Sequence, residues 1–149
     1  MAKPYISWYA KKLSDIKYSL DQQFYAGTYT DDDQIVVDIQ LWNNRWGSET
    51  VDDLEDYDIC FFFDRLEDAI LLTYCTVIYN GSYVVPFNIS ANKAILEFEE
   101  KPIIKGTKNN GSSLDNPDNF IQLRFMFSAT EERLKDHDLK SLYFEVLER

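Results

Sequence analysis

The most suggestive group of side chains is a short segment made of Trp42, Asn43, Asn44, Arg45 and Trp46. An exposed tryptophan ring can stack on a sugar ring, and neighbouring amide side chains can hydrogen-bond the sugar hydroxyls. The segment is therefore a candidate contact loop for a glycan. We favour a structural role, because tryptophans that flank a strand end can close the rim of a hydrophobic core, and the glycan contact stays the alternative.

Acidic residues gather in three places, and loop carboxylates are the ligands that calcium prefers. They are the run 31–33, the stretch 52–58, and the pair Asp115 and Asp118 around Pro117. None of them follows the twelve-residue calcium-binding pattern, with its central glycine and terminal glutamate. We interpret them as solvated turns of an acidic protein, and calcium binding stays the alternative.

Residue types for catalysis are scarce. The one histidine, His137, lies in a charged turn with no nucleophile motif near it. Cys60 and Cys75 stand in apolar runs, and with a single histidine they cannot supply a zinc site, so we expect buried free thiols. The sequence also lacks a glycine-rich phosphate loop. These observations predict a protein that is not an enzyme and has no catalytic residue, metal or cofactor.

The composition limits the classes of partner. The 149 residues carry a net charge of −11, with 26 acidic and 15 basic side chains, which argues against a nucleic-acid partner. No apolar run reaches the roughly 20 residues that span a membrane, and the start of the chain lacks the apolar segment of a secretory signal. We expect a soluble protein that binds neither nucleic acid nor membrane. A basic or neutral protein partner is compatible with the charge, and the oligomeric state is left open.

Alternating apolar and polar residues predict short β-strands along the chain. The clearest alternation is in 35–42, where every second residue from Ile35 to Leu41 is aliphatic. Strands are expected at 35–42, 57–63, 69–79, 83–89, 94–99, 121–127 and 142–146. The strand at 57–63 becomes apolar on both faces toward its end, which indicates a central place in a sheet.

Turn signals predict two hairpins. A charged turn at 64–68 separates the strands at 57–63 and 69–79, which should therefore pair with each other. The dipeptide Asn80-Gly81 predicts the second hairpin, because both residues accept the positive φ that a type I′ turn requires.

Four further segments have special patterns. Pro86 cannot donate to a strand ladder, so its strand should run at a sheet edge or break at a bulge. Gly, Asn, Ser, Asp and Pro fill 105–119, a long loop of the kind that often makes contacts. Ser128 with Glu131 predicts a single capped helical turn. In 7–20 the apolar spacing fits both a helix and a strand, and we favour the strand.

The strand pattern as a whole predicts the fold class. Seven or more short strands with one polar and one apolar face are typical of an all-β fold in which two antiparallel sheets pack face to face. We expect an immunoglobulin-like sandwich, with a jelly roll as the alternative. No repeat or linker divides the chain, so 1–149 is expected to form a single β-sandwich domain.

Three parts of the chain resemble small immunoglobulin-like virion proteins of tailed bacteriophages. They are the run Ile35–Trp46, the hairpin Tyr57–Tyr79 and the terminal strand Leu139–Leu147. The resemblance implies an auxiliary or decoration protein that docks on a capsid or tail protein assembly, and hence a place in the virion. The alternative function is carbohydrate binding through exposed Trp and Tyr side chains.

Overall fold

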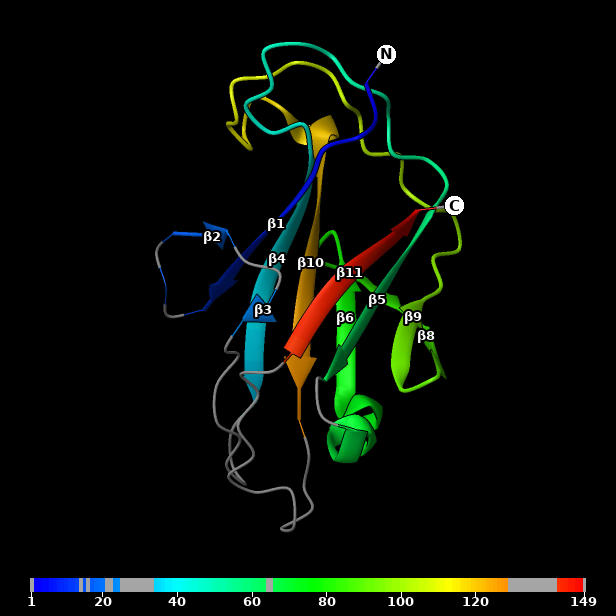
Figure 1. The fold of residues 1–149 in the computed structure, drawn as a ribbon. Helices are drawn as coiled ribbons and strands as arrows, with labels where there is room; N and C mark the ends of the chain where they lie inside the picture. Colours follow the sequence, from blue (N-terminus) through cyan, green and yellow to red (C-terminus); the bar gives the residue numbers. More distant parts are fainter. Residues whose placement is uncertain are drawn as a thin grey trace.

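The strands form two antiparallel sheets that pack face to face (Figure 1). The structure is a computed structural model that describes residues 2–13, 15, 17–20, 23–24, 34–63, 66–128 and 142–148. One sheet has six strands in the order β2-β1-β4-β10-β6-β7, and the other has five in the order β3-β11-β5-β9-β8. The predicted all-β sandwich of two antiparallel sheets is confirmed. The choice between an immunoglobulin-like and a jelly-roll path stays a prediction.

The six-stranded sheet is centred on two long strands that pair along their whole length. Its members are β1 (Ile6–Lys12), β2 (Ser19–Leu20), β4 (Ile35–Asn43), β6 (Cys75–Tyr79), β7 (Tyr83–Val85) and β10 (Phe120–Phe127). β10 lies between β4 and β6, so a late strand occupies the middle of a sheet begun by early ones. For the N-terminal segment 7–20 the favoured strand is confirmed at 7–12 and 19–20, where β1 and β2 form two separate strands that pair with each other.

The five-stranded sheet has β5 at its centre, as the two-sided apolar pattern predicted. Its members are β3 (Gln23–Phe24), β5 (Tyr57–Phe63), β8 (Phe87–Ser90), β9 (Lys93–Leu96) and β11 (Leu142–Glu148). β5 pairs with β11 on one side and with β9 on the other. The strand expected at 94–99 is shorter and ends at Leu96. The Glu97 backbone N–H still donates to the carbonyl of the opposite Pro86 at 2.8 Å, but Pro86 has no N–H to return a bond, so the ladder stops there.

The core lies between the sheets and is rich in aromatic rings. Phe61 stacks on Phe144 within the five-stranded sheet, with ring centroids 5.4 Å apart. Phe125 of the opposite sheet meets Phe61 edge to face at 5.6 Å. Such pairs contribute about 0.5–1.5 kcal/mol each beyond the burial of their area. Cys60 and Cys75 are buried free thiols, as expected.

The predicted hairpin between 57–63 and 69–79 is wrong. Residues Leu66–Tyr74 form a 3-10 helix, η1, and only the last part of the apolar run is a strand. β5 is already paired on both sides, so its chain crosses to the other sheet through η1. The helix covers one end of the core with Leu71 and Leu72, which are both buried. A continuous apolar run without Gly or Pro does not by itself distinguish a strand from a buried helix.

The second hairpin prediction is confirmed. β6 pairs with β7, and Asn80 and Gly81 in the turn have φ angles of 54° and 84°. Pro86 separates β7 from β8, and the chain passes there from the six-stranded to the five-stranded sheet. β7 and β8 are each the outermost strand of their sheet, which agrees with the edge position predicted for the proline.

Two long connections meet at one end of the sandwich, opposite η1 (Figure 1). They are the loop 44–56 and the segment 97–119, which contains the predicted loop and only a short 3-10 helix, η2 (Pro117–Asn119). Leu54 and Ile104 form an isolated bridge between the two connections. The long loop is confirmed, and it is an ordered element bound to its neighbour.

Some predictions concern residues outside the described part of the chain. These are the acidic run 31–33, the helical turn after Ser128 and the position of His137. Within the described ranges, no helix is both long enough and apolar enough to cross a lipid bilayer.

Candidate functional site

The predicted contact segment changes from core to surface within five residues. Trp42 and Asn43 are fully buried, and Asn44 is buried as well. Arg45 is half-buried, whereas Trp46 keeps 59% of its surface exposed. Of the two tryptophans proposed to contact a sugar, only Trp46 therefore has an accessible ring.

The two asparagines hold the long loops together. Asn43 donates from Nδ2 to the carbonyl of Ile104 at 3.1 Å, and its Oδ1 accepts the backbone N–H of Tyr5 at 2.9 Å. Asn44 donates from Nδ2 to the carbonyl of Gly106 at 2.9 Å. These amides satisfy backbone groups of neighbouring segments, so they serve the fold and are not free for a ligand.

Arg45 is the centre of an aromatic cluster that the sequence did not reveal. Its Cζ lies 4.4 Å from the ring centroid of Tyr9, 4.4 Å from that of Trp42 and 4.2 Å from that of Trp46. Its Nε donates to the carbonyl of Gly111 at 3.0 Å. The guanidinium thus covers Trp42 and supports Trp46, through cation–π contacts worth roughly 0.5–2 kcal/mol each.

Trp46 is held in a strained backbone conformation. Its φ is 61°, a left-handed value that costs a bulky side chain about 1–3 kcal/mol. Its backbone N–H donates to Oδ1 of Asn109 at 3.0 Å, and Gly111 packs so closely that an added Cβ would lie 1.8 Å from the Trp46 Nε1. The exposed indole is therefore a fixed platform at the loop end of the sandwich.

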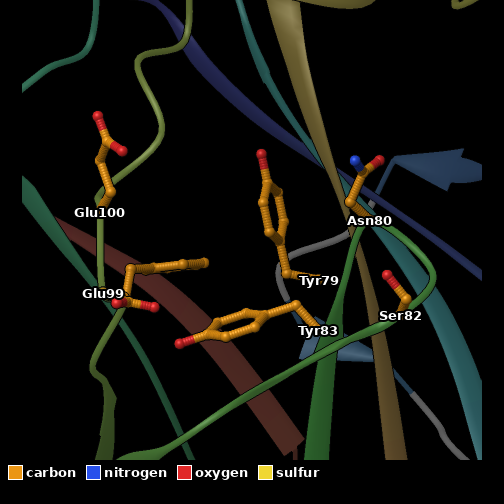
Figure 2. A pocket seen from close by; sticks show the side chains of 7 residues that line it. Tyr79, Asn80, Ser82, Tyr83, Glu99 and Glu100 are labelled. Atoms are coloured by element: carbon orange, nitrogen blue, oxygen red, sulfur yellow. The ribbon is translucent and has the colours of Figure 1, made fainter.

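A second candidate site is an open pocket beside the β6–β7 turn. It encloses about 700 Å³, which falls within the range of ligand pockets, roughly 300–1,000 Å³. Its lining residues are Tyr79, Asn80, Ser82, Tyr83, Phe98, Glu99 and Glu100. In Figure 2 the Tyr83 ring extends toward Glu99, and Tyr79 stands between the turn and the segment that carries the two glutamates.

The register of the hairpin places both tyrosines on one face. Tyr79 is directly opposite Tyr83, and two residues earlier in the ladder Val77 is opposite Val85. Since alternate residues of a strand share a face, the tyrosines lie on the same face as these valines, which are buried in the core. The tyrosine rings therefore continue the inner surface of the sheet beyond the closed part of the core.

The opposite wall comes from the segment after β9. The Phe98 ring meets the Tyr79 ring edge to face, with centroids 5.5 Å apart. Phe98 also packs against the core, so it fixes the segment that carries Glu99 and Glu100. Both glutamates are exposed at the rim. The pocket thus has an aromatic floor and an acidic edge.

The acidic edge has no basic partner within the part of the chain that the structure describes. The ion pairs found there join other side chains, and no Lys or Arg lies within 4.0 Å of Glu99 or Glu100. The adjacent Lys101 pairs with Asp58 at 3.1 Å. The next residue, Pro102, accepts a hydrogen bond from the Tyr57 hydroxyl at 2.5 Å. Among the described residues, the two negative charges beside the aromatic rings therefore have no basic partner.

The acidic stretches predicted as solvated turns contribute to the fold where they are described. Asp53 accepts the backbone N–H of Gly106 at 3.0 Å and the Lys105 ammonium at 3.2 Å. The hydrogen bond from Gly106 is the main reason that the pKa of Asp53 is lowered. Among the described residues, no three His, Cys, Asp or Glu side chains gather closely enough to hold a metal ion.

Comparison with known proteins adds no relative. No family model, curated protein or solved structure matches this chain. The likeness to phage virion proteins therefore stays a prediction. The groups that we propose to bind in the pocket and at Trp46 are therefore inferred from the chemistry of the side chains that form these two sites.

Proposed function

We propose that this protein is a non-enzymatic binding module that docks on a protein assembly, and that the assembly is a capsid or tail of a virion. The observation that supports docking is the pocket of about 700 Å³ beside an open sheet edge. Aromatic side chains in a concave site are the usual anchors of protein interfaces.

The strands next to the pocket add apolar surface. Tyr83 and Val84 on β7 are exposed by 36% and 58%, and Ile89 on β8 is exposed by 42%. Both strands are the outermost of their sheets, and an outer strand offers unpaired backbone groups to a partner chain. The pocket and this edge together form the docking face of the proposal.

The test is co-sedimentation of the purified protein with assembled phage capsids and tails. Binding is expected for the wild type and a loss of at least tenfold in affinity for Tyr83→Ala. Leu114→Ala is the matched control, because Leu114 is 91% exposed in the loop region and does not line the pocket. Absence of sedimentation with every capsid and tail preparation would refute the virion proposal.

The second candidate function is carbohydrate binding at Trp46. The specific observation in its favour is an exposed indole that a strained backbone and the Arg45 guanidinium hold in place. A rigid aromatic face is the element that stacks on sugars. A glycan array should then give a signal that Trp46→Ala abolishes and Leu114→Ala leaves intact. A blank array would remove this candidate.

A further inference from the structure

We propose that the pocket between the β6–β7 turn and the segment 98–100 binds an arginine side chain of the docking partner. This inference deepens the proposed docking function and rests on it. The docking proposal names a partner assembly, and this inference adds the chemical group of that partner that enters the pocket.

The first argument is electrostatic. Glu99 and Glu100 stand at the rim without an ion-pair partner among the described residues, while nearby Lys101 is engaged by Asp58. The whole chain carries a net charge of −11, so the long-range field also attracts a cation. An anionic group would be repelled at this place, and a neutral group would leave both carboxylates without a charged partner.

The second argument is the aromatic floor. Tyr79 and Tyr83 occupy opposite positions of the hairpin, and the Tyr83 ring extends toward Glu99 (Figure 2). A cation over an aromatic face gains roughly 0.5–2 kcal/mol, and the gain is larger where water is displaced. Acidic side chains alone would not define a site, but a hollow of about 700 Å³ with both rings and carboxylates does.

The preference for arginine over lysine follows from shape. A guanidinium is planar, stacks on aromatic rings and donates two parallel hydrogen bonds to a carboxylate. An ammonium is a strongly hydrated point charge that stacks less well. The pocket has aromatic rings on one wall and carboxylates on the other. The rings can stack on the plane of a guanidinium while the carboxylates accept hydrogen bonds from its N–H groups.

The experiment is an NMR titration of the ¹⁵N-labelled chain with two short peptides, acetyl-Gly-Arg-Gly-amide and its citrulline counterpart. Citrulline keeps the size and planarity of arginine but has no charge. The arginine peptide should shift the amides of 79–83 and 98–100 and bind at least tenfold more tightly than the citrulline peptide. Its affinity should fall as NaCl rises from 20 to 300 mM, because exposed charges are screened.

Variants test the same claim on the protein. Glu99→Gln with Glu100→Gln should reduce affinity for the arginine peptide at least tenfold, whereas Glu97→Gln, an exposed charge change outside the pocket, should not. The three glutamates are exposed, so the fold should persist, and an unchanged thermal midpoint checks this. Equal affinity of the two peptides, shifts elsewhere on the surface, or full binding by the double variant would overturn the arginine site.

The two proposals fail in different ways. If the protein sediments with capsids or tails and the double glutamate variant does so equally well, docking stands and the arginine site falls. If the arginine peptide binds at the pocket but no assembly is bound, the arginine site stands and the virion function falls. If a neutral sugar shifts the amide resonances of 79–83 and 98–100 and the arginine peptide does not, the pocket is not an arginine site.

Discussion

Arg124 on β10 forms a two-point ion pair with Asp38 on β4, the residue directly opposite it in the ladder. The Nε–Oδ1 distance is 2.7 Å and the Nη2–Oδ2 distance is 3.2 Å. This contact raises the pKa of Arg124. The pair connects the two central strands of the six-stranded sheet on the face that points away from the core.

The first prediction concerns this ion pair. Arg124→Leu and Asp38→Leu should each lower the free energy of unfolding, and a double-mutant cycle should give a coupling of about 1 kcal/mol. The two-point geometry and the low exposure of Asp38 place this value at the upper end of the range for surface ion pairs, and the exposure of Arg124 keeps it from being larger. Urea unfolding of the four proteins measures the coupling. Strictly additive effects of the two substitutions would contradict it.

The second prediction concerns Gly111, which has a φ of 79° and touches the Trp46 indole. Gly111→Ala should destabilise the protein by about 2–4 kcal/mol, because strain and a clash add together. Gly81→Ala is the matched control, since Gly81 has a φ of 84° but open space around it. Thermal unfolding should show a smaller loss of about 1 kcal/mol there. Equal losses at both positions would mean that Trp46 moves away freely.

The third prediction uses the three tryptophans as reporters. Trp8 and Trp42 are buried, whereas Trp46 is exposed. Acrylamide should therefore quench one part of the fluorescence readily, and Trp46→Phe should remove that part. Trp8→Phe should retain it. Persistence of the readily quenched emission in Trp46→Phe would show that another indole is open to solvent.

The fourth prediction concerns alkaline pH. Burial raises the pKa of the Cys60 thiol to about 11 from an ordinary value near 9, with Glu145 as the next cause. The unfolded chain therefore releases this proton at a lower pH than the folded chain does. The contribution to stability is lost as pH rises from about 9 to 11, by about 1 kcal/mol between pH 8.5 and 10. Urea unfolding across that range should show the decline.

The control for the thiol is Cys60→Ala. This variant should be less stable at neutral pH because it leaves a small cavity. Its stability should decline less steeply between pH 8.5 and 10 than that of the wild type. Burial also raises the pKa of Cys75, so part of the decline should remain. Parallel curves for the two proteins would exclude Cys60 as a source.

The fifth prediction concerns Asn43, the buried side chain that joins the two long loops. Asn43→Ala should cost about 2–4 kcal/mol, because it removes its side-chain hydrogen bonds and leaves buried backbone groups unpaired. Asn88→Ala, at an exposed strand position, should stay within about 0.5 kcal/mol of the wild type. Chemical denaturation distinguishes the two.

The sequence predicted the strands well where apolar residues alternate with other types. In β10 the alternation follows directly from a sheet with the core on one side only. In β4 the alternation also marks the core face, although Asp38, Gln40 and Trp42 on the outer face are themselves buried. The pattern failed in Leu66–Tyr74, because an end cap that buries Leu71 and Leu72 is as apolar as a strand. An apolar run can extend a sheet only if a neighbouring strand still has a free edge. The pairing of every strand decides this, so it cannot be read from the run alone.

The sites were predictable only in part. Trp42 occupies an outward-facing position of β4, which suggested exposure, but the Arg45 guanidinium folds over its ring. In the pocket, the Asn80-Gly81 turn is enough to place Tyr79 and Tyr83 on a common face. The facing wall could not be foreseen, since Glu99 and Glu100 reach it only through the crossing at Pro86 and the pairing of β8 with β9.

The anchoring of the loops by Asn43 and Asn44 divides the loop end into two zones with different tolerance to engineering. The carbonyls of Ile104 and Gly106 accept side-chain hydrogen bonds from Asn43 and Asn44, so added residues there would break the anchor. Around Leu114, which is 91% exposed, an inserted peptide would leave those bonds untouched. A displayed epitope or a fluorescent tag therefore belongs at 113–115.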